Sequence, residues 1–314
     1  PSLVGSERCI RASPFPIFSR NGSTMVSSLI KKIGNTLSLN KGTKISGQTV
    51  LITGGTSGMG LIMAKECAKR GASAIIIWDI ARLDETVATL EGLGVKAGGY
   101  KVNVADVENV NAQAEQTLKD FGKVDILIQC AGVVSGKSLL ELTDEQIDRS
   151  LDINLRGVFS VTRAFLGQMK SRNHGHIAVI SSAAGTVGPA NMTDYCATKW
   201  GVRGMLESLR NELAKEHSAV QILTIYPFYV NTGMFEGAKT KVPLLFPILD
   251  QYKVSMKILD AIEAGQPELF IPKLVQYATS LVRVLPTHWY DIVSTWLGIN
   301  ASMDDFVGRQ SQKK

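Results

Sequence analysis

A tyrosine and a lysine four residues apart, Tyr195 and Lys199, are the side chains of this sequence best suited to moving a proton. In a helix, positions four apart lie next to each other on one face. A phenol with a pKa of about 10 is a poor base near neutrality, and a neighbouring ammonium group favours its deprotonated form. Ser182 ends an apolar run thirteen residues earlier and is placed to hold a substrate oxygen beside the phenol. The three residues together suit acid–base chemistry on a hydroxyl or carbonyl group.

A glycine-rich turn at residues 53–60 reads Thr-Gly-Gly-Thr-Ser-Gly-Met-Gly, between an apolar run and a helical segment predicted over residues 61–70. Glycine permits positive φ and lets the backbone approach a pyrophosphate closely. A helix N-terminus adds free N–H groups and positive potential. A glycine motif in this strand-to-helix context predicts a dinucleotide site.

Asp79 ends the second apolar run, nineteen residues beyond Gly60. An acid at this place can accept hydrogen bonds from both ribose hydroxyls of adenosine and would repel a 2′-phosphate. Neither Ser57 in the turn nor Ile80 after the acid offers the cation that a 2′-phosphate requires. The sequence therefore favours NAD over NADP, and the nearby Arg82 keeps NADP as the alternative.

Short apolar runs of strand type alternate with helical segments along most of the chain. The helical segments include residues 106–121 and one that begins with a capping box of Thr143 and Gln146. Strands that are apolar on both faces and separated by helices indicate a parallel sheet covered on both sides. We expect an α/β fold with a doubly wound parallel sheet of the Rossmann type, whose ligand lies at the carboxyl ends of the strands. The expected strands span residues 49–53, 74–79, 99–103, 124–129, 176–182, 220–226 and 269–271.

The composition is that of a folded globular chain, with 314 residues, 45% hydrophobic and 20% charged. The net charge of +6 arises within residues 1–47, which hold seven basic residues and one acid. The remainder is neutral, which argues against a basic nucleic-acid groove. Four cysteines without C-x-x-C spacing predict reduced thiols, and four histidines without ligand spacing argue against a catalytic metal.

The basic leader, residues 1–46, is rich in serine and poor in acids, as organelle transit peptides are. A second interpretation is a short helix on an anionic membrane surface, with Lys31 and Lys32 off its apolar stripe. A third interpretation is a disordered leader whose periodicity arises by chance. No run reaches the roughly 18 to 20 apolar residues of a spanning helix, so no transmembrane span is expected. The apolar stripe consists of Val26, Leu29, Ile30, Ile33 and Leu37.

The chain beyond Thr232 becomes apolar and proline-punctuated over residues 234–249. Such a segment suits a lid over an oily substrate pocket, or a segment packed back on the core. Residues 273–285 and 288–297 are two further candidates for amphipathic helices. Their aromatic residues suit either a membrane interface or the core, namely Tyr277, Trp289, Tyr290 and Trp296.

Taken in order, these motifs resemble those of the short-chain dehydrogenase/reductase family over about residues 47–275. The resemblance implies a single Rossmann-type domain with a C-terminal helical substrate lid, bounded by the leader (1–46) and an amphipathic helical extension (276–314). The matching positions are the turn at 53–60, Asn103-Val104, Ala131-Gly132, Asn154, Ser182, Tyr195, Lys199 and the loop at 227–232.

The resemblance also implies a role for each matching residue. Tyr195 is the expected acid and base, and Lys199 is expected to bind the nicotinamide ribose and lower the pKa of the phenol. Ser182 is expected to orient the substrate oxygen, and Asn154 to hold a water in a proton relay. Val230 and Thr232 are expected to fix the carboxamide. The implied cofactor-binding residues are Gly54, Ser57, Gly58, Met59, Gly60, Asp79, Ile80, Asn103, Val104, Cys130, Ala131, Gly132, Tyr195, Lys199, Pro227, Val230 and Thr232.

The sequence departs from the family pattern in three places. Gln129-Cys130 replaces Asn-Asn before Ala-Gly, Asn103 replaces the aspartate after the third strand, and Phe228 replaces the glycine after the loop proline. Cys130 lacks the amide that would brace the central strand. Phe228 and the loop after it resemble a lipid-metabolising branch that contains retinol dehydrogenases and lipid-droplet 17-beta-hydroxysteroid dehydrogenases.

That branch implies an NAD(H)-dependent oxidoreductase that interconverts a hydrophobic alcohol (retinoid, steroid or fatty alcohol) and its aldehyde or ketone. The alternatives are an NADP-dependent carbonyl reductase of a related branch and a low-activity, nucleotide-binding lipid-droplet scaffold. The resemblance further implies a homodimer through residues 154–170 and 198–215, and a peripheral location on the cytosolic face of the endoplasmic reticulum membrane or a lipid droplet. The leader makes the mitochondrion the alternative location.

Overall fold

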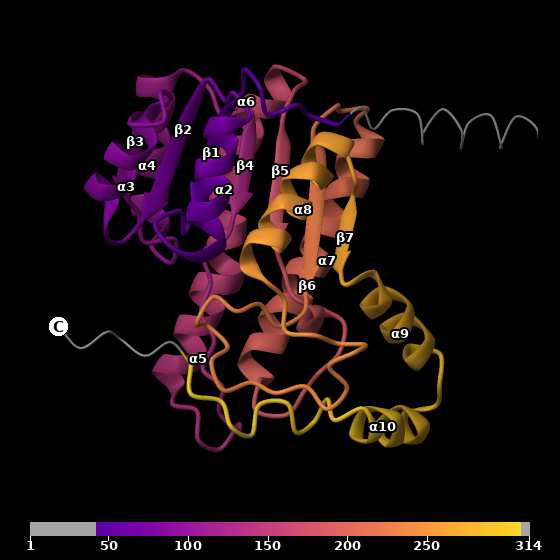
Figure 1. Cartoon of the computed structure of the whole chain (residues 1–314). Coiled ribbons are helices and arrows are strands. Elements are labelled where there is room, and N and C mark those ends of the chain that lie inside the picture. The colour runs from indigo at the N-terminus through magenta and orange to yellow at the C-terminus, as the bar shows by residue number, and fades with distance from the viewer. Residues whose placement is uncertain (1–41, 309–314) are drawn as a thin grey trace, which may run out of the picture. The chain divides into compact units, whose positions relative to one another are not determined.

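The computed structural model describes residues 42–308, drawn in colour in Figure 1. Residues 1–41 and 309–314 lie outside the described part. The expectations for residues 1–41 of the leader, including its apolar stripe and Cys9, therefore fall outside the described residues.

Within residues 42–308, seven parallel strands form one sheet in the order β3-β2-β1-β4-β5-β6-β7. The order turns back between β1 and β4, so the carboxyl ends of these two strands border the crevice in which doubly wound folds bind their ligands. The doubly wound parallel sheet is thus confirmed. The strands are β1 (Thr49–Thr53), β2 (Ala74–Asp79), β3 (Lys96–Lys101), β4 (Ile126–Gln129), β5 (His176–Ile180), β6 (Gln221–Pro227) and β7 (Glu268–Ile271).

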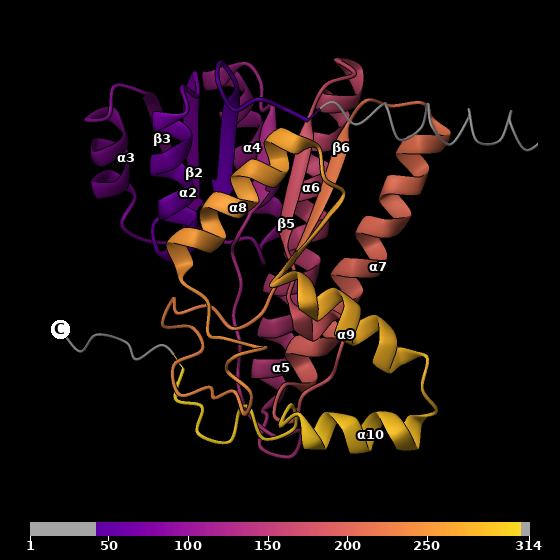
Figure 2. The same ribbon diagram turned by 45° about the vertical axis from the view of Figure 1, so that its right-hand side comes forward.

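Helices cover both faces of the sheet, as Figures 1 and 2 show. Successive strand side chains point to opposite faces, so Ile75 and Ile77 join the core under α2, α3 and α8. Ile76 and Trp78 join the core under α4, α6 and α7. The helices are α2 (Gly58–Lys69), α3 (Leu83–Glu91), α4 (Val107–Phe121), α5 (Asp144–Leu151), α6 (Gly157–Ser171), α7 (Thr193–Lys215) and α8 (Gln251–Ala264).

The element boundaries follow the sequence closely where an element is apolar. β1 and β2 span the residues expected, and the capping box is present, because Thr143 and Gln146 each accept a hydrogen bond from the other's backbone N–H. The third strand begins three residues earlier than expected. It is the edge strand, half-exposed along its length, so its polar residues do not form the apolar run that marked the other strands.

His176 begins β5 at the end of the strand opposite the glycine-rich turn, and its side chain is fully buried. Its Nδ1 lies 3.3 Å from the Thr43 hydroxyl, and its Nε2 has no hydrogen-bond partner within residues 42–308. Burial lowers the pKa of His176 to about 4. The ring is therefore neutral at physiological pH.

Two further helices follow β7, α9 (Lys273–Arg283) and α10 (Thr287–Trp296). They confirm the helical segments expected near residues 273–285 and 288–297. Figure 2 shows both helices beyond the carboxyl ends of the strands. No helix in the described part of the chain is long and apolar enough to cross a bilayer.

Candidate active site

A cavity of about 300 Å³ lies along the carboxyl ends of β1, β2, β4, β5 and β6. It is lined by every cofactor-binding position expected from the sequence except Gly60, and by Ser182. Asn154 does not line it. The chain thus brings together residues that lie more than a hundred positions apart, because parallel strands all end at the same edge of the sheet.

The glycine-rich turn is folded too tightly for side chains at two positions. Gly54 has φ +68°, and a Cβ there would lie 2.9 Å from the Ala131 amide nitrogen. A Cβ on Gly60 would lie 2.1 Å from the Gly54 carbonyl oxygen, which explains why Gly60 packs inside the turn rather than lining the cavity. The first turn of α2 carries no acidic residue and no side-chain cap. Its N–H groups and positive potential therefore fit the pyrophosphate of a dinucleotide.

Asp79 is anchored directly to this turn. Its Oδ2 accepts hydrogen bonds from the Thr56 amide (3.0 Å) and hydroxyl (2.7 Å), and its Oδ1 accepts one from the Ile80 amide (2.7 Å). The half-buried carboxylate lines the cavity beside Ser57. Arg82 begins α3 with φ 53°, is exposed and does not line the cavity.

The expected loop at 227–232 returns to the glycine-rich turn. Pro227 ends β6, and Val230 pairs with Leu249 in a single parallel bridge. The Thr232 side chain lies 3.7 Å from the position of a Cβ on Gly58. The loop and the turn therefore border the same part of the cavity.

Tyr195 and Lys199 share one face of α7, and both are 4% exposed. The Lys199 ammonium donates a 2.8 Å hydrogen bond to the Ile180 carbonyl and lies 5.5 Å from the centre of the Tyr195 ring. Ser182 follows β5, and its hydroxyl accepts a hydrogen bond from the Ala184 amide (3.1 Å). The three side chains line one end of the cavity, as expected from their spacing.

Burial sets the protonation of this cluster. It raises the pKa of the Tyr195 phenol, and the hydrogen bond with Ser182 lowers it in part. Burial also lowers the pKa of Lys199 to about 8. The lysine is thus still charged at neutral pH.

Asn154 lies in a short π-helical stretch, Asp152–Arg156, between α5 and α6. Its side-chain amide donates a 2.8 Å hydrogen bond to the Val133 carbonyl and accepts another of 2.8 Å from the Val133 amide. The side chain therefore fixes the loop that follows β4.

The two residues that replace Asn-Asn at the end of β4 have different partners. Gln129 donates to the Thr162 hydroxyl on α6 (2.8 Å), which ties the strand to the helix layer. The backbone amides of Cys130 and Ala131 both donate to the Thr53 hydroxyl, at 3.2 and 3.3 Å. Thr53 thus braces β1 against the chain after β4 without a side-chain amide at position 130.

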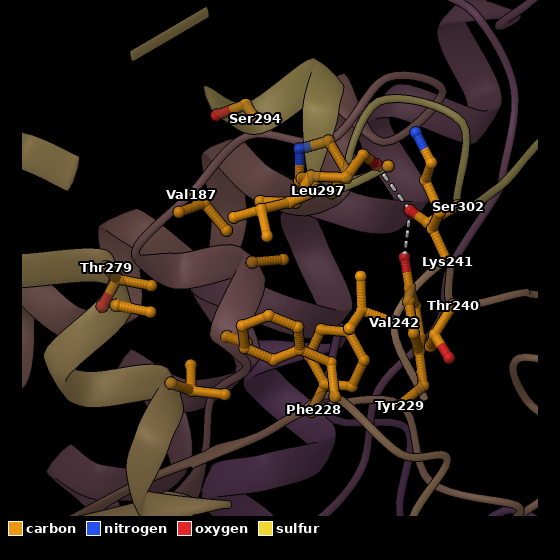
Figure 3. A pocket seen from close by; sticks show the side chains of 18 of the residues that line it. Val187, Phe228, Tyr229, Thr240, Lys241, Val242, Thr279, Ser294, Leu297 and Ser302 are labelled. Carbon is orange, nitrogen blue, oxygen red and sulfur yellow. Dashed lines mark hydrogen bonds between the residues drawn. The ribbon is translucent and has the colours of Figure 1, made fainter. Parts of the chain in front are cut away.

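A second, smaller cavity of about 70 Å³ adjoins the first and is almost entirely apolar (Figure 3). Ser182, Phe228 and Phe235 line both cavities. The segment expected to form a lid contributes Phe235, Val242 and Phe246 to the wall, and α9 and α10 close another side. The helical region expected at the C-terminal end is therefore present, whereas residues 234–249 form turns and irregular chain rather than a helix.

Phe228 stands where the two cavities meet. Its ring lies 4.8 Å from that of Tyr229 and 5.7 Å from that of Phe246, and its amide donates to the Ile271 carbonyl (2.9 Å). Where the family pattern has a flexible glycine, this chain has a fixed aromatic wall.

Several wall residues were not expected from the sequence. The Tyr229 hydroxyl lies 2.8 Å from that of Ser302, and Met303 is buried in the cluster that contains Tyr195. Ser302 and Met303 follow the last periodic segment, so no pattern marks them. Arg149 on α5 lines the larger cavity without belonging to any motif.

Comparison with known proteins gives a consistent result over most of the chain. A family model described as short chain dehydrogenase matches residues 48–243. The chain is 36% identical over 272 residues to epidermal retinol dehydrogenase 2 of Mus musculus, covering 85% of this chain and 88% of that protein. It is 34% identical over 299 residues to retinol dehydrogenase 10 of Rattus norvegicus, covering 85% and 87%.

Among solved structures, the chain is similar to a short-chain dehydrogenase/reductase from Burkholderia phymatum in complex with NAD. The two are 25% identical and superpose with a TM-score of 0.69, covering 77% of this chain and 94% of that one.

Proposed function

Because this chain belongs to the short-chain dehydrogenase/reductase family, and is thus an oxidoreductase that acts on CH–OH groups with a nicotinamide dinucleotide, we propose that it interconverts a hydrophobic alcohol and its aldehyde or ketone with NAD(H). The observation that carries this proposal is the meeting of the two cavities. Ser182 lines both, so an oily molecule in the smaller cavity would present its oxygen to Ser182 and Tyr195. The mainly apolar wall suits a retinoid, steroid or fatty alcohol, and retinol dehydrogenases are among the most similar relatives.

In the proposed mechanism, a bound nicotinamide ring supplies the hydride acceptor or donor. Tyr195 takes or gives the hydroxyl proton, and Ser182 orients the oxygen by a hydrogen bond. Lys199 keeps a positive charge near the phenol, which favours the phenolate that oxidation requires. Because Val133 occupies the side-chain amide of Asn154, a relay water at this residue would contact its main-chain carbonyl.

We assign NAD rather than NADP on the basis of Asp79. Its carboxylate is fixed by Thr56 and Ile80, so it is held in place to accept hydrogen bonds from ribose hydroxyls and to repel a 2′-phosphate. Arg82, the cation nearest to Asp79 in the sequence, is exposed and does not line the cavity. It is therefore not placed to bind the 2′-phosphate of NADP.

A peripheral membrane or lipid-droplet surface is the proposed location of the chain, and the exposed faces of α9 and α10 support it. Apolar side chains recur along each helix at helical spacing, with between 46% and 77% of each exposed. The opposite face of α9 lines the apolar cavity through Val275 and Ala278, and exposed apolar residues at helical spacing are typical of a helix that lies on a membrane surface. The exposed residues are Tyr277 and Leu281 on α9, Val284 directly after it, and Trp289, Ile292 and Trp296 on α10.

Flotation with anionic phospholipid vesicles tests this surface. The chain with Trp289→Ser and Trp296→Ser should float less than the natural chain, whereas Leu93→Ser, at an exposed site after α3, should not change flotation. Equal flotation of all three would contradict the role of α9 and α10. Imaging of a fluorescent fusion then separates the endoplasmic reticulum and lipid droplets from the alternative, the mitochondrion.

A homodimer through α6 and α7 is the proposed oligomeric state. Phe159 on α6 and Trp200 on α7 are 43% and 37% exposed, so each helix offers an aromatic side chain that a second copy of the chain would cover. Sedimentation velocity should give a dimer for the natural chain and a monomer for Phe159→Glu. A monomeric natural chain would overturn this assignment.

The experiment that tests the function is absorbance at the NADH band with purified protein, NAD or NADP, and retinol, steroid alcohols and long-chain alcohols. We expect turnover with NAD and at least one lipid class. Turnover with NADP alone would favour the carbonyl reductase alternative. Cofactor binding without turnover of any alcohol would favour a nucleotide-binding scaffold on lipid droplets.

A further inference from the structure

Ser294 on α10 lines the apolar cavity and carries a buried hydroxyl group. The residue is 2% exposed, and its Oγ is buried without a hydrogen-bond partner in the described part of the chain. Buried polar atoms are nearly always paired in folded proteins. An unpaired hydroxyl beside a cavity therefore points to a partner that the ligand brings.

The usual partner of a helical serine is a carbonyl in the preceding turn. Ser255 on α8 follows this rule and donates to the Gln251 carbonyl at 2.8 Å, as Thr279 on α9 does to Gln276 at 3.2 Å. Ser294 forms no such bond in the structure. Because the residue lines the cavity, rotation about its Cα–Cβ bond would bring the hydroxyl toward the cavity.

Ser294 stands away from the reacting groups. Figure 3 shows it on α10, across the view from Phe228 and Tyr229, with Val187 and Leu297 between them. Ser182, whose hydroxyl is hydrogen-bonded with Tyr195, lines the same cavity from the segment after β5. A substrate whose reacting oxygen sits at Ser182 would therefore bring a different part of its skeleton to Ser294.

From this arrangement, and resting on the proposed function, we infer that the preferred substrate carries a second hydrogen-bonding oxygen remote from the carbinol that reacts, and that Ser294 binds this oxygen. The substrate class is thus an apolar skeleton with oxygen at two separated positions, such as a diol or a hydroxy-ketone. A hydrocarbon skeleton with a single terminal hydroxyl, as in retinol or a simple fatty alcohol, leaves Ser294 unpaired and binds less tightly.

Calorimetric titration with matched ligands tests this inference without requiring turnover. The probes are α,ω-alkanediols of increasing length and the 1-alkanol of each length, with NADH present throughout. The ratio of the two dissociation constants reports the second hydroxyl alone. In the natural chain we expect this ratio to favour the diol most at one chain length, and Ser294→Ala to shift it against the diol by about 10-fold at that length.

Ser255→Ala is the matched control, because it removes a buried helical hydroxyl that does not line the cavity. It should leave the ratio unchanged at every length. A ratio that Ser294→Ala does not alter at any length overturns the inference. Turnover is measured separately on the same ligands: if alcohols bind with the expected ratio but none is oxidised, the proposed function fails while the distal oxygen site stands.

Discussion

The side chain of Asn154 and the main chain of Val133 form a closed pair of hydrogen bonds, each 2.8 Å long. Asn154 is fully buried in the π-helical stretch, whereas Val133 lines the cofactor cavity. One side chain thus ties the π-helical stretch between α5 and α6 to the wall of the cavity.

Replacing Asn154 with alanine should therefore affect both stability and activity. The Val133 amide and carbonyl would each lose a partner, so we expect the free energy of unfolding to fall by about 2 to 4 kcal/mol. Asn154→Asp keeps the acceptor for the Val133 amide but places a carboxylate against the carbonyl. Denaturant unfolding and kcat of each variant measure both effects. Unchanged unfolding in Asn154→Ala would show that the hydrogen-bonded pair contributes little.

Tyr195→Phe should abolish proton transfer while the fold is retained. We expect kcat to fall by at least about 100-fold, the contribution of a positioned acid or base. The control is Tyr229→Phe, which removes a second buried phenol from the same cluster and breaks its bond with Ser302. That variant should change KM more than kcat. Comparable losses of kcat in both variants would argue against Tyr195 as the acid and base.

The buried charge of Lys199 should reduce the stability of the chain without cofactor. Its pKa is about 8 in the folded chain and 10.5 when unfolded, so the unfolded chain binds more protons between these values. Stability therefore rises as the pH increases from 8 to 10.5, and below pH 8 the penalty is on the order of 3 kcal/mol.

Lys199→Met should accordingly raise the free energy of unfolding at pH 7 by about 1 to 3 kcal/mol. The increase is smaller than the full burial penalty because the variant also loses the hydrogen bond with the Ile180 carbonyl. The difference from the natural chain should narrow as the pH approaches 10.5. Chemical denaturation at pH 7 and pH 10 measures this. A gap that widens with pH would contradict burial as the cause.

The cofactor preference should respond to Asp79 and its neighbour. Asp79→Ser with Ile80→Arg removes the anion and adds a cation at a position that is 64% exposed and lines the cavity rim. We expect the ratio of kcat/KM for NADP to that for NAD to rise on the order of 100-fold. Ile80→Arg alone should produce a smaller rise. No change in the ratio would show that Asp79 does not face the ribose.

His176 should make the fold sensitive to acid. Its pKa is about 4 in the folded chain and 6.5 when unfolded, so unfolding takes up a proton between these values. Stability is retained above pH 6.5 and falls by on the order of 3 kcal/mol as the pH drops to 4. His176→Gln should flatten the loss of stability over this pH range. His217→Gln, at an exposed site after α7, should leave the slope unchanged.

The parts of the fold that sequence patterns predicted are those built by short-range rules. β2 was found at its expected residues because its apolar run ends at Asp79, where the chain leaves the core. The expected acid–base residues lie together because Tyr195 and Lys199 share α7, and Ser182 follows directly after the carboxyl end of β5.

The parts that could not be predicted depend on contacts between distant segments. The Tyr229–Ser302 bond joins residues 73 positions apart, and nothing around Ser302 distinguishes it from an ordinary loop serine. The unpaired hydroxyl of Ser294 likewise becomes visible only when α10 is packed against the cavity. The start of β3 was misplaced because an edge strand needs no apolar run.

The sheet ends at Ile271, and the last residue lining the cofactor cavity is Phe235, whereas the smaller cavity draws part of its wall from α9, α10 and the segment up to Ser302. A proteolytic cut after β7 would consequently separate two properties that the intact enzyme couples. The shortened chain would retain all seven described strands and every residue that lines the larger cavity, but would lose part of the wall of the apolar cavity. Such a fragment would bind the cofactor without turning over an alcohol. An assay that measures nucleotide binding alone would not distinguish it from the intact chain.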